Sequence, residues 1–69
     1  MHYFEIYIYI SELHNYFIFF KMEGEKIEEK DIIEHALLAK LFIDDGDEKY
    51  VKYIKEISEE DYEFVLLGS

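Results

Sequence analysis

The stretches Phe4-Glu5-Ile6-Tyr7-Ile8-Tyr9-Ile10 and Tyr16-Phe17-Ile18-Phe19-Phe20-Lys21-Met22 decide the fold of this chain. Both are rich in β-branched and aromatic residues, and the first alternates strictly between two kinds of side chain, which is typical of β-strands. The residues between them, 11–15, are predicted to form a five-residue hairpin loop. The two stretches therefore form an antiparallel hairpin in which Ile10 lies opposite Tyr16.

In this register the hairpin has two apolar faces of different character. The aliphatic face holds Phe4, Ile6, Ile8, Ile10, Tyr16, Ile18, Phe20 and Met22. The opposite face, called the aromatic face below, holds Tyr3, Tyr7, Tyr9, Phe17 and Phe19. An ion pair between Glu5 and Lys21 across the strands supports the register, since such pairs contribute roughly 0.2–1 kcal/mol. We expect the aliphatic face to form the core.

A chain of 69 residues is too small to cover both faces comfortably, because such a chain buries only about 60% of its unfolded surface. Disulfides are excluded by the absence of cysteine, and His2, His14 and His35 show no ligand spacing. We therefore expect a second copy of the chain or a partner to cover the aromatic face. The alternative is that the C-terminal segment of the same chain folds over it.

The rest of the chain predicts two helices and one strand. Over residues 28–42 the apolar residues are spaced as in an amphipathic helix, and Gly46 is a plausible terminator of this helix. The expected buried stripe of the helix comprises Ile32, Ile33, Ala36, Leu37, Leu41 and Ile43. Residues 50–57 alternate again and predict a third strand, which a crossover would place beside the first strand in the order 2-1-3. Residues 58–68 favour a short helix capped by Ser58, with a fourth strand as the alternative. The fold class is thus α+β, a single domain over residues 1–69.

The net charge of −10 is concentrated in one part of the chain. Residues 23–69 carry fifteen acids against six lysines, or −9, whereas residues 1–22 carry −1. Direct binding to nucleic acid or to anionic lipid is disfavoured because both require a basic surface. A basic protein partner is electrostatically favoured. No apolar run approaches 18 residues and no signal peptide is evident, so neither membrane insertion nor secretion is expected, and we predict a cytoplasmic protein.

Two acidic clusters are candidate partner-binding sites. The first comprises Asp44, Asp45, Asp47 and Glu48, and the second comprises Glu59, Glu60 and Asp61. The first could bind calcium, but placing Gly46 at loop position 6 of an EF-hand puts Leu41 at position 1, where an acid is required. The alternative interpretations of this cluster are a solvated turn and a charged docking surface. The second cluster has a simpler role in capping a helix. We expect no metal and no cofactor.

Catalysis has the weakest support in the sequence. His35 lies one turn after Asp31 and could pair with it, but no serine lies in the context of a nucleophile. The three glycines stand apart, so no glycine-rich loop is available to bind phosphate. The sequence therefore predicts a protein that is not an enzyme.

The pattern as a whole predicts a protein-binding module that inhibits a basic, nucleic-acid-handling protein, with its acidic face as a possible mimic of nucleic acid. In size, acidity and outline the chain resembles small phage-encoded inhibitors, including anti-CRISPR proteins and antitoxins. This resemblance covers general character and carries over no site residue. If the chain is viral, it would act in the host cytoplasm. The alternative function is a small structural or regulatory homodimer whose acidity is incidental.

Overall fold

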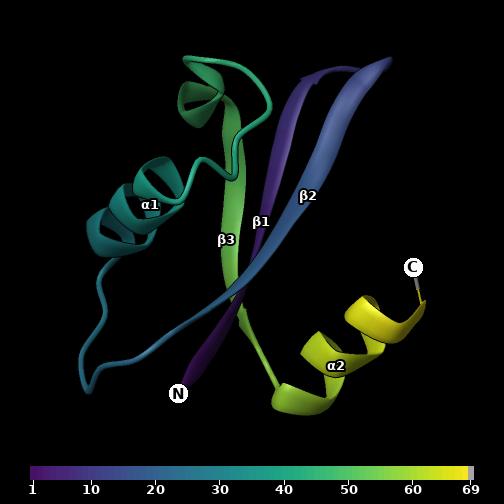
Figure 1. Ribbon diagram of the computed structural model, residues 1–69. Helices are drawn as coiled ribbons and strands as arrows, with labels where there is room; N and C mark the ends of the chain where they lie inside the picture. The colour runs from purple at the N-terminus through teal and green to yellow at the C-terminus, as the bar shows by residue number, and fades with distance from the viewer. Residues whose placement is uncertain (69) are drawn as a thin grey trace.

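The computed structural model, which describes residues 1–68, has a three-stranded antiparallel sheet and two helices on opposite sides of it (Figure 1). The elements follow the order β1 (His2–Ser11), β2 (His14–Met22), α1 (Glu29–Leu38), a 3-10 helix η1 (Asp47–Tyr50), β3 (Val51–Ile57) and α2 (Glu59–Gly68). The strand order is β2-β1-β3. The predicted α+β class and the predicted sheet order are confirmed, and residue 69 of the predicted domain lies outside the described residues.

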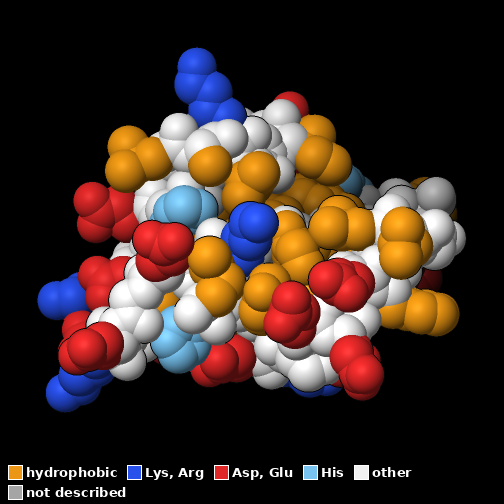
Figure 2. Space-filling model, turned by 60° about the horizontal axis from the view of Figure 1, so that its bottom comes forward, with side chains coloured by type: hydrophobic (Ala, Val, Ile, Leu, Met, Phe, Trp, Pro, Cys, Tyr) orange, Lys and Arg blue, Asp and Glu red, His pale blue; other side chains and the backbone are white. Residues whose placement is uncertain are grey.

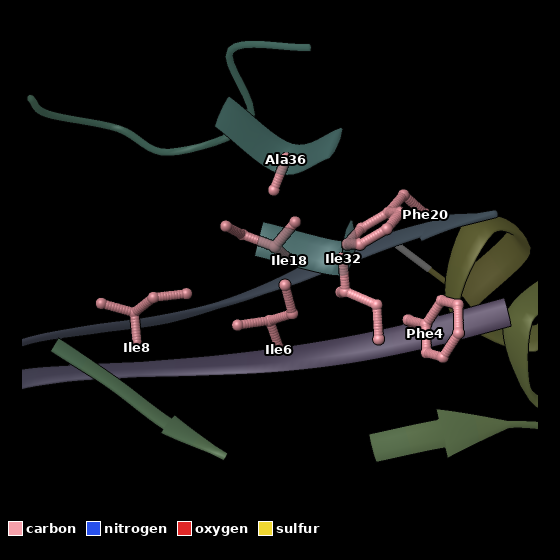
Figure 3. Packing of buried hydrophobic residues seen from close by; sticks show 7 residues of the cluster. All are labelled: Phe4, Ile6, Ile8, Ile18, Phe20, Ile32 and Ala36. Carbon is pink, nitrogen blue, oxygen red and sulfur yellow. The ribbon is translucent and has the colours of Figure 1, made fainter. Parts of the chain in front are cut away.

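The core lies between the aliphatic face of the sheet and α1, as the alternation of the hairpin predicts. Its buried members are Phe4, Ile6, Ile8, Ile18, Phe20, Ile32 and Ala36. The two members from α1 point down onto the side chains of β1 and β2 (Figure 3). Ile6 and Ile8 have no solvent exposure at all. Burying an isoleucine side chain stabilises the fold by about 1.5–3 kcal/mol, so this one layer is the main source of stability.

The hairpin register differs from the prediction by two residues. Phe4 pairs with Phe20 and Ile6 pairs with Ile18, whereas the sequence predicts Phe4 opposite Met22. Because side chains alternate with a period of two, a shift of two residues leaves every side chain on its predicted face. The predicted residues of the two faces are therefore correct, although the predicted cross-strand partners are wrong.

A tighter turn and a bulge account for this shift. Ser11 pairs with His14, so only residues 12–13 lie between the strands, and the register changes between Tyr9 and Ser11. The side-chain amide of Asn15 donates hydrogen bonds to two carbonyl oxygens of the turn, at 3.1 and 3.2 Å. Two-residue connections are the commonest in hairpins because their twist matches that of the strands. The predicted five-residue loop is wrong for this reason.

The expected ion pair between Glu5 and Lys21 is also wrong. Lys21 lies opposite Tyr3, and Glu5 lies between Phe19 on β2 and Lys55 on β3. A cross-strand ion pair contributes only roughly 0.2–1 kcal/mol, so it is too weak to fix the register by itself.

Helix α1 begins with a capping box. Glu28 occupies the N-cap, its side chain accepts from the backbone of Asp31, and its own N–H donates to the carboxylate of Asp31 at 3.1 Å. Such reciprocal bonds satisfy two of the four backbone N–H groups that a helix start leaves unpaired. Ile32 and Ala36 follow on the buried side of the helix. The helix is thus positioned by its first turn and its core contacts.

The helix ends at Leu38, earlier than predicted, and Gly46 does not terminate it. Lys40 adopts a left-handed conformation with φ 56°. The N–H of Leu41 donates to Ala36 O at 3.0 Å, and that of Lys40 donates to Leu37 O at 3.1 Å. These two bonds form a Schellman motif, which usually has glycine at the left-handed position. A lysine there is not recognisable from the sequence as a stop signal.

The early end narrows the buried stripe of α1. Leu41 still packs against the core, but Leu37 is 44% exposed and Ile43 is 64% exposed. Their predicted places in the core are therefore wrong, because Ile43 lies beyond the end of the helix and Leu37, although within it, lies outside the buried side formed by Ile32 and Ala36.

The C-terminal segment is a helix, and the alternative of a fourth strand is excluded. Ser58 accepts a hydrogen bond at its Oγ from the N–H of Asp61 at 3.1 Å. Its carbonyl accepts from the N–H of Tyr62 at 3.0 Å. The serine cap with three acids behind it starts this helix as the sequence predicts.

Candidate protein-binding surfaces

The acidic turn between α1 and β3 is held in place by one buried carboxylate. Asp47 is only 5% exposed and accepts a hydrogen bond from the Tyr16 hydroxyl at 2.5 Å. The same oxygen accepts from the N–H of Asp44 at 3.2 Å, while the Tyr16 hydroxyl accepts from the N–H of Ile43 at 3.2 Å. Gly46, with φ 87°, supplies the left-handed residue that the turn needs. Asp47 therefore orders the turn instead of presenting its charge to solvent.

The pKa of Tyr16 is raised by burial first and by its hydrogen bond to Asp47 second. The phenol consequently stays protonated up to higher pH than a free tyrosine, and it continues to donate to the carboxylate. This bond joins the sheet to the turn across 31 residues of sequence.

A pocket of about 510 Å³ opens beside this turn. Leu37 and Phe42 supply apolar surface, and Asp44, Asp45 and Glu48 supply three carboxylates. A lysine and the glycine of the turn complete the lining, namely Lys40 and Gly46. Apolar surface beside a concentrated negative charge is suited to a lysine or arginine side chain, whose stem is apolar and whose head is cationic.

The second acidic cluster does not join the first. Asp44 and Asp45 precede β3, whereas Glu59, Glu60 and Asp61 follow it and are exposed in the first turn of α2. Seven residues of strand at about 3.3 Å each separate the two clusters by roughly 20 Å. They therefore lie at opposite ends of β3, as Figure 1 shows, and do not form one continuous patch.

The aromatic face is a connected set of rings. Tyr7 stacks on Phe17 with ring centroids 4.6 Å apart, and Phe17 stacks on Phe19 at 6.0 Å. Tyr7 also lies 6.2 Å from Tyr9 and 5.6 Å from Tyr53. Stacked and tilted rings at these distances stabilise one another by about 0.5–1.5 kcal/mol per pair beyond the effect of burial. All five predicted residues lie on one side of the sheet, with Tyr3 at its end.

Helix α2 lies on this side of the sheet and contacts the face at that end. The Tyr62 ring lies 5.0 Å from the Tyr3 ring. Farther along, Phe17 remains 50% exposed and Tyr9 remains 39% exposed, whereas Tyr7 is half-buried. The C-terminal segment thus covers only part of the face, so the alternative that this segment folds over it holds only near Tyr3.

Hydrophobic side chains also remain exposed on α2 itself. Phe64 is 77% exposed and Leu67 is 86% exposed. Seen from the end of the molecule where α2 begins, hydrophobic side chains gather from the middle of the view out to the α2 side, with acidic side chains along one border (Figure 2). Apolar surface that is bordered by charge is typical of protein interfaces.

Tyr53 also belongs to the aromatic face, although the sequence did not predict it there. Its hydroxyl donates to Glu5 at 2.8 Å, which raises the pKa of Tyr53, with burial as the second cause. The alternation of β3 hints at this role, but Lys52 and Lys55 obscure which side faces inward. The apolar residues of the pocket are not predicted, because the sequence places Leu37 in the buried stripe of the helix and Phe42 within a longer helix.

The candidate catalytic pair is not assembled. The Asp31 carboxylate is engaged in the helix cap at 3.1 Å from the Glu28 nitrogen. The His35 ring stacks on Phe20 with centroids 5.2 Å apart. Within residues 1–68 no hydrogen bond joins Asp31 to His35, so both side chains have structural roles.

Among residues 1–68, no helix combines the length and the apolar character needed to cross a membrane. Comparison of the chain with models of protein families, with curated proteins and with solved structures found no match.

Proposed function

We propose that this chain is a non-catalytic protein-binding module that inhibits a basic, nucleic-acid-handling protein by occluding its nucleic-acid-binding surface. The net charge of −10 supports a basic partner and disfavours direct contact with nucleic acid. A phage-encoded anti-defence protein of the anti-CRISPR type is the setting that we propose for such an inhibitor. It would act in the cytoplasm of the host.

The observation that carries this proposal is the acid-rimmed pocket. Its three exposed or half-exposed carboxylates belong to Asp44, Asp45 and Glu48, and no lysine lies within ion-pair distance of any of them in the described part of the chain. The apolar surface of Leu37 and Phe42 would receive the stem of a basic side chain. Proteins that bind phosphate groups present such side chains on their surface.

The acids of α2 would supply a second point of contact. They lie roughly 20 Å from the pocket, a separation set by the length of β3. Two separated clusters would engage two basic groups of one cleft, in the manner of a nucleic-acid backbone. The proposed partner-binding residues are therefore those of both clusters, with Asp47 supporting the first from beneath.

The proposal is tested by capturing partners from the native host with the immobilised chain. A partner of the proposed kind is displaced by added DNA or RNA, and its affinity falls steeply between about 50 and 500 mM salt, because exposed charges are screened. Affinity that does not change with salt, or a partner that binds nucleic acid and this chain at once, would contradict the proposal.

The exposure of the aromatic face favours a second candidate function, a homodimer. Phe17 is 50% exposed and Tyr53 is 40% exposed, on a face whose rings already stack on one another. Aromatic residues are enriched in the cores of such interfaces.

Sedimentation should then show a dimer at low micromolar concentration, and Phe17→Ser with Phe19→Ser should give a monomer or an unfolded chain. A wild-type monomer at about 10 μM would count against the dimer. Both functions are compatible, since they use different surfaces.

A further inference from the structure

Three side chains capable of binding a metal meet where the hairpin turn approaches the acidic turn. A ring nitrogen of His14 and one carboxylate oxygen from each of Asp44 and Asp47 all lie within 4.8 Å of one another. His14 begins β2, whereas the two acids come some thirty residues later. The hairpin turn and the acidic turn lie at the same end of the sheet in Figure 1. The sequence gives no sign of this site because the three residues have no regular spacing.

We propose that His14, Asp44 and Asp47 bind a divalent transition metal of the zinc class. Imidazole nitrogen and carboxylate oxygen are common zinc ligands, each about 2.0–2.2 Å from the ion, so two ligands of one ion lie at most about 4.4 Å apart. The three candidate ligand atoms all lie within 4.8 Å of one another, which is close to this limit. Three protein ligands leave the remaining position to water. The inference goes beyond the proposed function and does not depend on it.

The environment of the three ligands favours a cation. No lysine lies within ion-pair distance of Asp44 or Asp47 among residues 1–68. Asp45 and Glu48 add two further negative charges to the same turn. The His14 ring packs 6.1 Å from the Tyr16 ring, and its nitrogens have no hydrogen bond within the described chain. Its lone pair is therefore available to an ion.

The buried carboxylate is also held in position. Asp47 Oδ2 accepts from the Tyr16 hydroxyl at 2.5 Å and from the Asp44 N–H at 3.2 Å. Hydrogen bonds of this kind to a ligating group fix its orientation and raise metal affinity. A bound ion would fasten β2 to the acidic turn. That is a common reinforcement in domains of this size that lack disulfides.

The test is a titration of the full, chelator-treated chain with zinc chloride, followed by calorimetry and thermal unfolding. We expect one zinc ion per chain and a rise in Tm of about 6–11 °C at tenfold excess over the Kd. His14→Gln and Asp44→Asn should each weaken binding by at least about tenfold. The matched controls are His35→Gln, which removes an imidazole outside the three ligands and should bind zinc as the wild type does, and Asp45→Asn, which removes one nearby charge but no ligand and should lose clearly less affinity than Asp44→Asn.

Absence of binding up to about 1 mM zinc would overturn the proposal. So would an Asp45→Asn variant that loses as much affinity as Asp44→Asn, since diffuse charge would then explain the binding. A ligand variant that fails to fold does not prevent the test, because NMR of the wild type locates the ion. Zinc should shift the ring signals of His14, and a shift confined to His2 or His35 would contradict the assignment.

Discussion

At the scale of single residues, the hydrogen bond between Tyr16 and Asp47 connects the sheet to the acidic turn. The carboxylate is 5% exposed, so it cannot exchange its protein partners for bulk water. Because the turn supplies the walls of the pocket, the phenol has an indirect role in the proposed function. It positions the acids Asp44 and Asp45 without contacting a partner itself.

Replacing Tyr16 with phenylalanine should lower the free energy of unfolding by about 1–3 kcal/mol. The reason is that a buried carboxylate loses its hydroxyl donor while the ring remains. Chemical denaturation monitored by circular dichroism measures the change. Tyr50→Phe is the matched control, since the Tyr50 side chain is exposed and contacts only Lys49 among the described rings and cations. An equal effect of both substitutions would show that the bond adds nothing.

The raised pKa of Tyr16 also predicts how stability depends on pH. Its value in the folded chain lies above 10.0, the ordinary value for an unfolded chain. Above that pH the unfolded state loses its proton first, so stability is fully present below about pH 10 and falls as the pH rises through the folded value. Tyr16→Phe should show a shallower fall between about pH 9.5 and 11.5 than the wild type does. Identical slopes in the two proteins would contradict this assignment.

At the scale of elements, α2 is a helix that contributes no buried residue to the core. None of its residues is buried, and its ring contact with the sheet is the pair Tyr3 and Tyr62. Elements with few buried contacts open locally at small free-energy cost. The exposed length of the aromatic face thus depends on how firmly this one helix is held.

Replacing Tyr62 with alanine should release α2 and leave the sheet folded. The lost ring pair removes about 0.5–1.5 kcal/mol in addition to the lost burial. Hydrogen exchange should then become faster in residues 59–68 and stay unchanged in β1 and β2. Phe64→Ala is the control, because Phe64 is 77% exposed and its removal should leave exchange as in the wild type. Faster exchange throughout the molecule would show instead that α2 is an integral part of the core.

At the same scale, the sequence predicts the elements better than their ends. Strand alternation and the cap at Ser58 follow from local chemistry, the β2-β1-β3 order follows from the crossover connection, and all three are confirmed. The hairpin register is wrong because a shift of two residues keeps both faces intact, so hydrophobic patterning cannot detect it. The end of α1 is wrong because Lys40 takes a conformation that usually marks a glycine.

At the scale of the whole molecule, charge and apolar surface are distributed in a way that composition alone does not reveal. The acids predicted to form one negative surface fall into two groups at opposite ends of β3. Leu37, near the end of α1, and Phe42, which follows the helix, line one pocket, and His14 meets Asp44 only through tertiary contact. The sequence therefore predicts which types of residue make up these surfaces, but it does not predict which residues come together in space. We propose that the pocket is the main docking point and that the aromatic face is a separate interface.

The most direct measurement compares the affinity of one captured partner for two variants that remove the same number of negative charges. The first, Asp44→Asn with Asp45→Asn and Glu48→Gln, neutralises the pocket. The second, the control, changes three exposed acids in the connection before α1 and at its first residue, namely Glu23→Gln, Glu25→Gln and Glu29→Gln. The pocket variant should bind at least about tenfold more weakly than the control, which should stay close to the wild type. Equal affinities for the two variants would contradict the proposal that the pocket is the docking site.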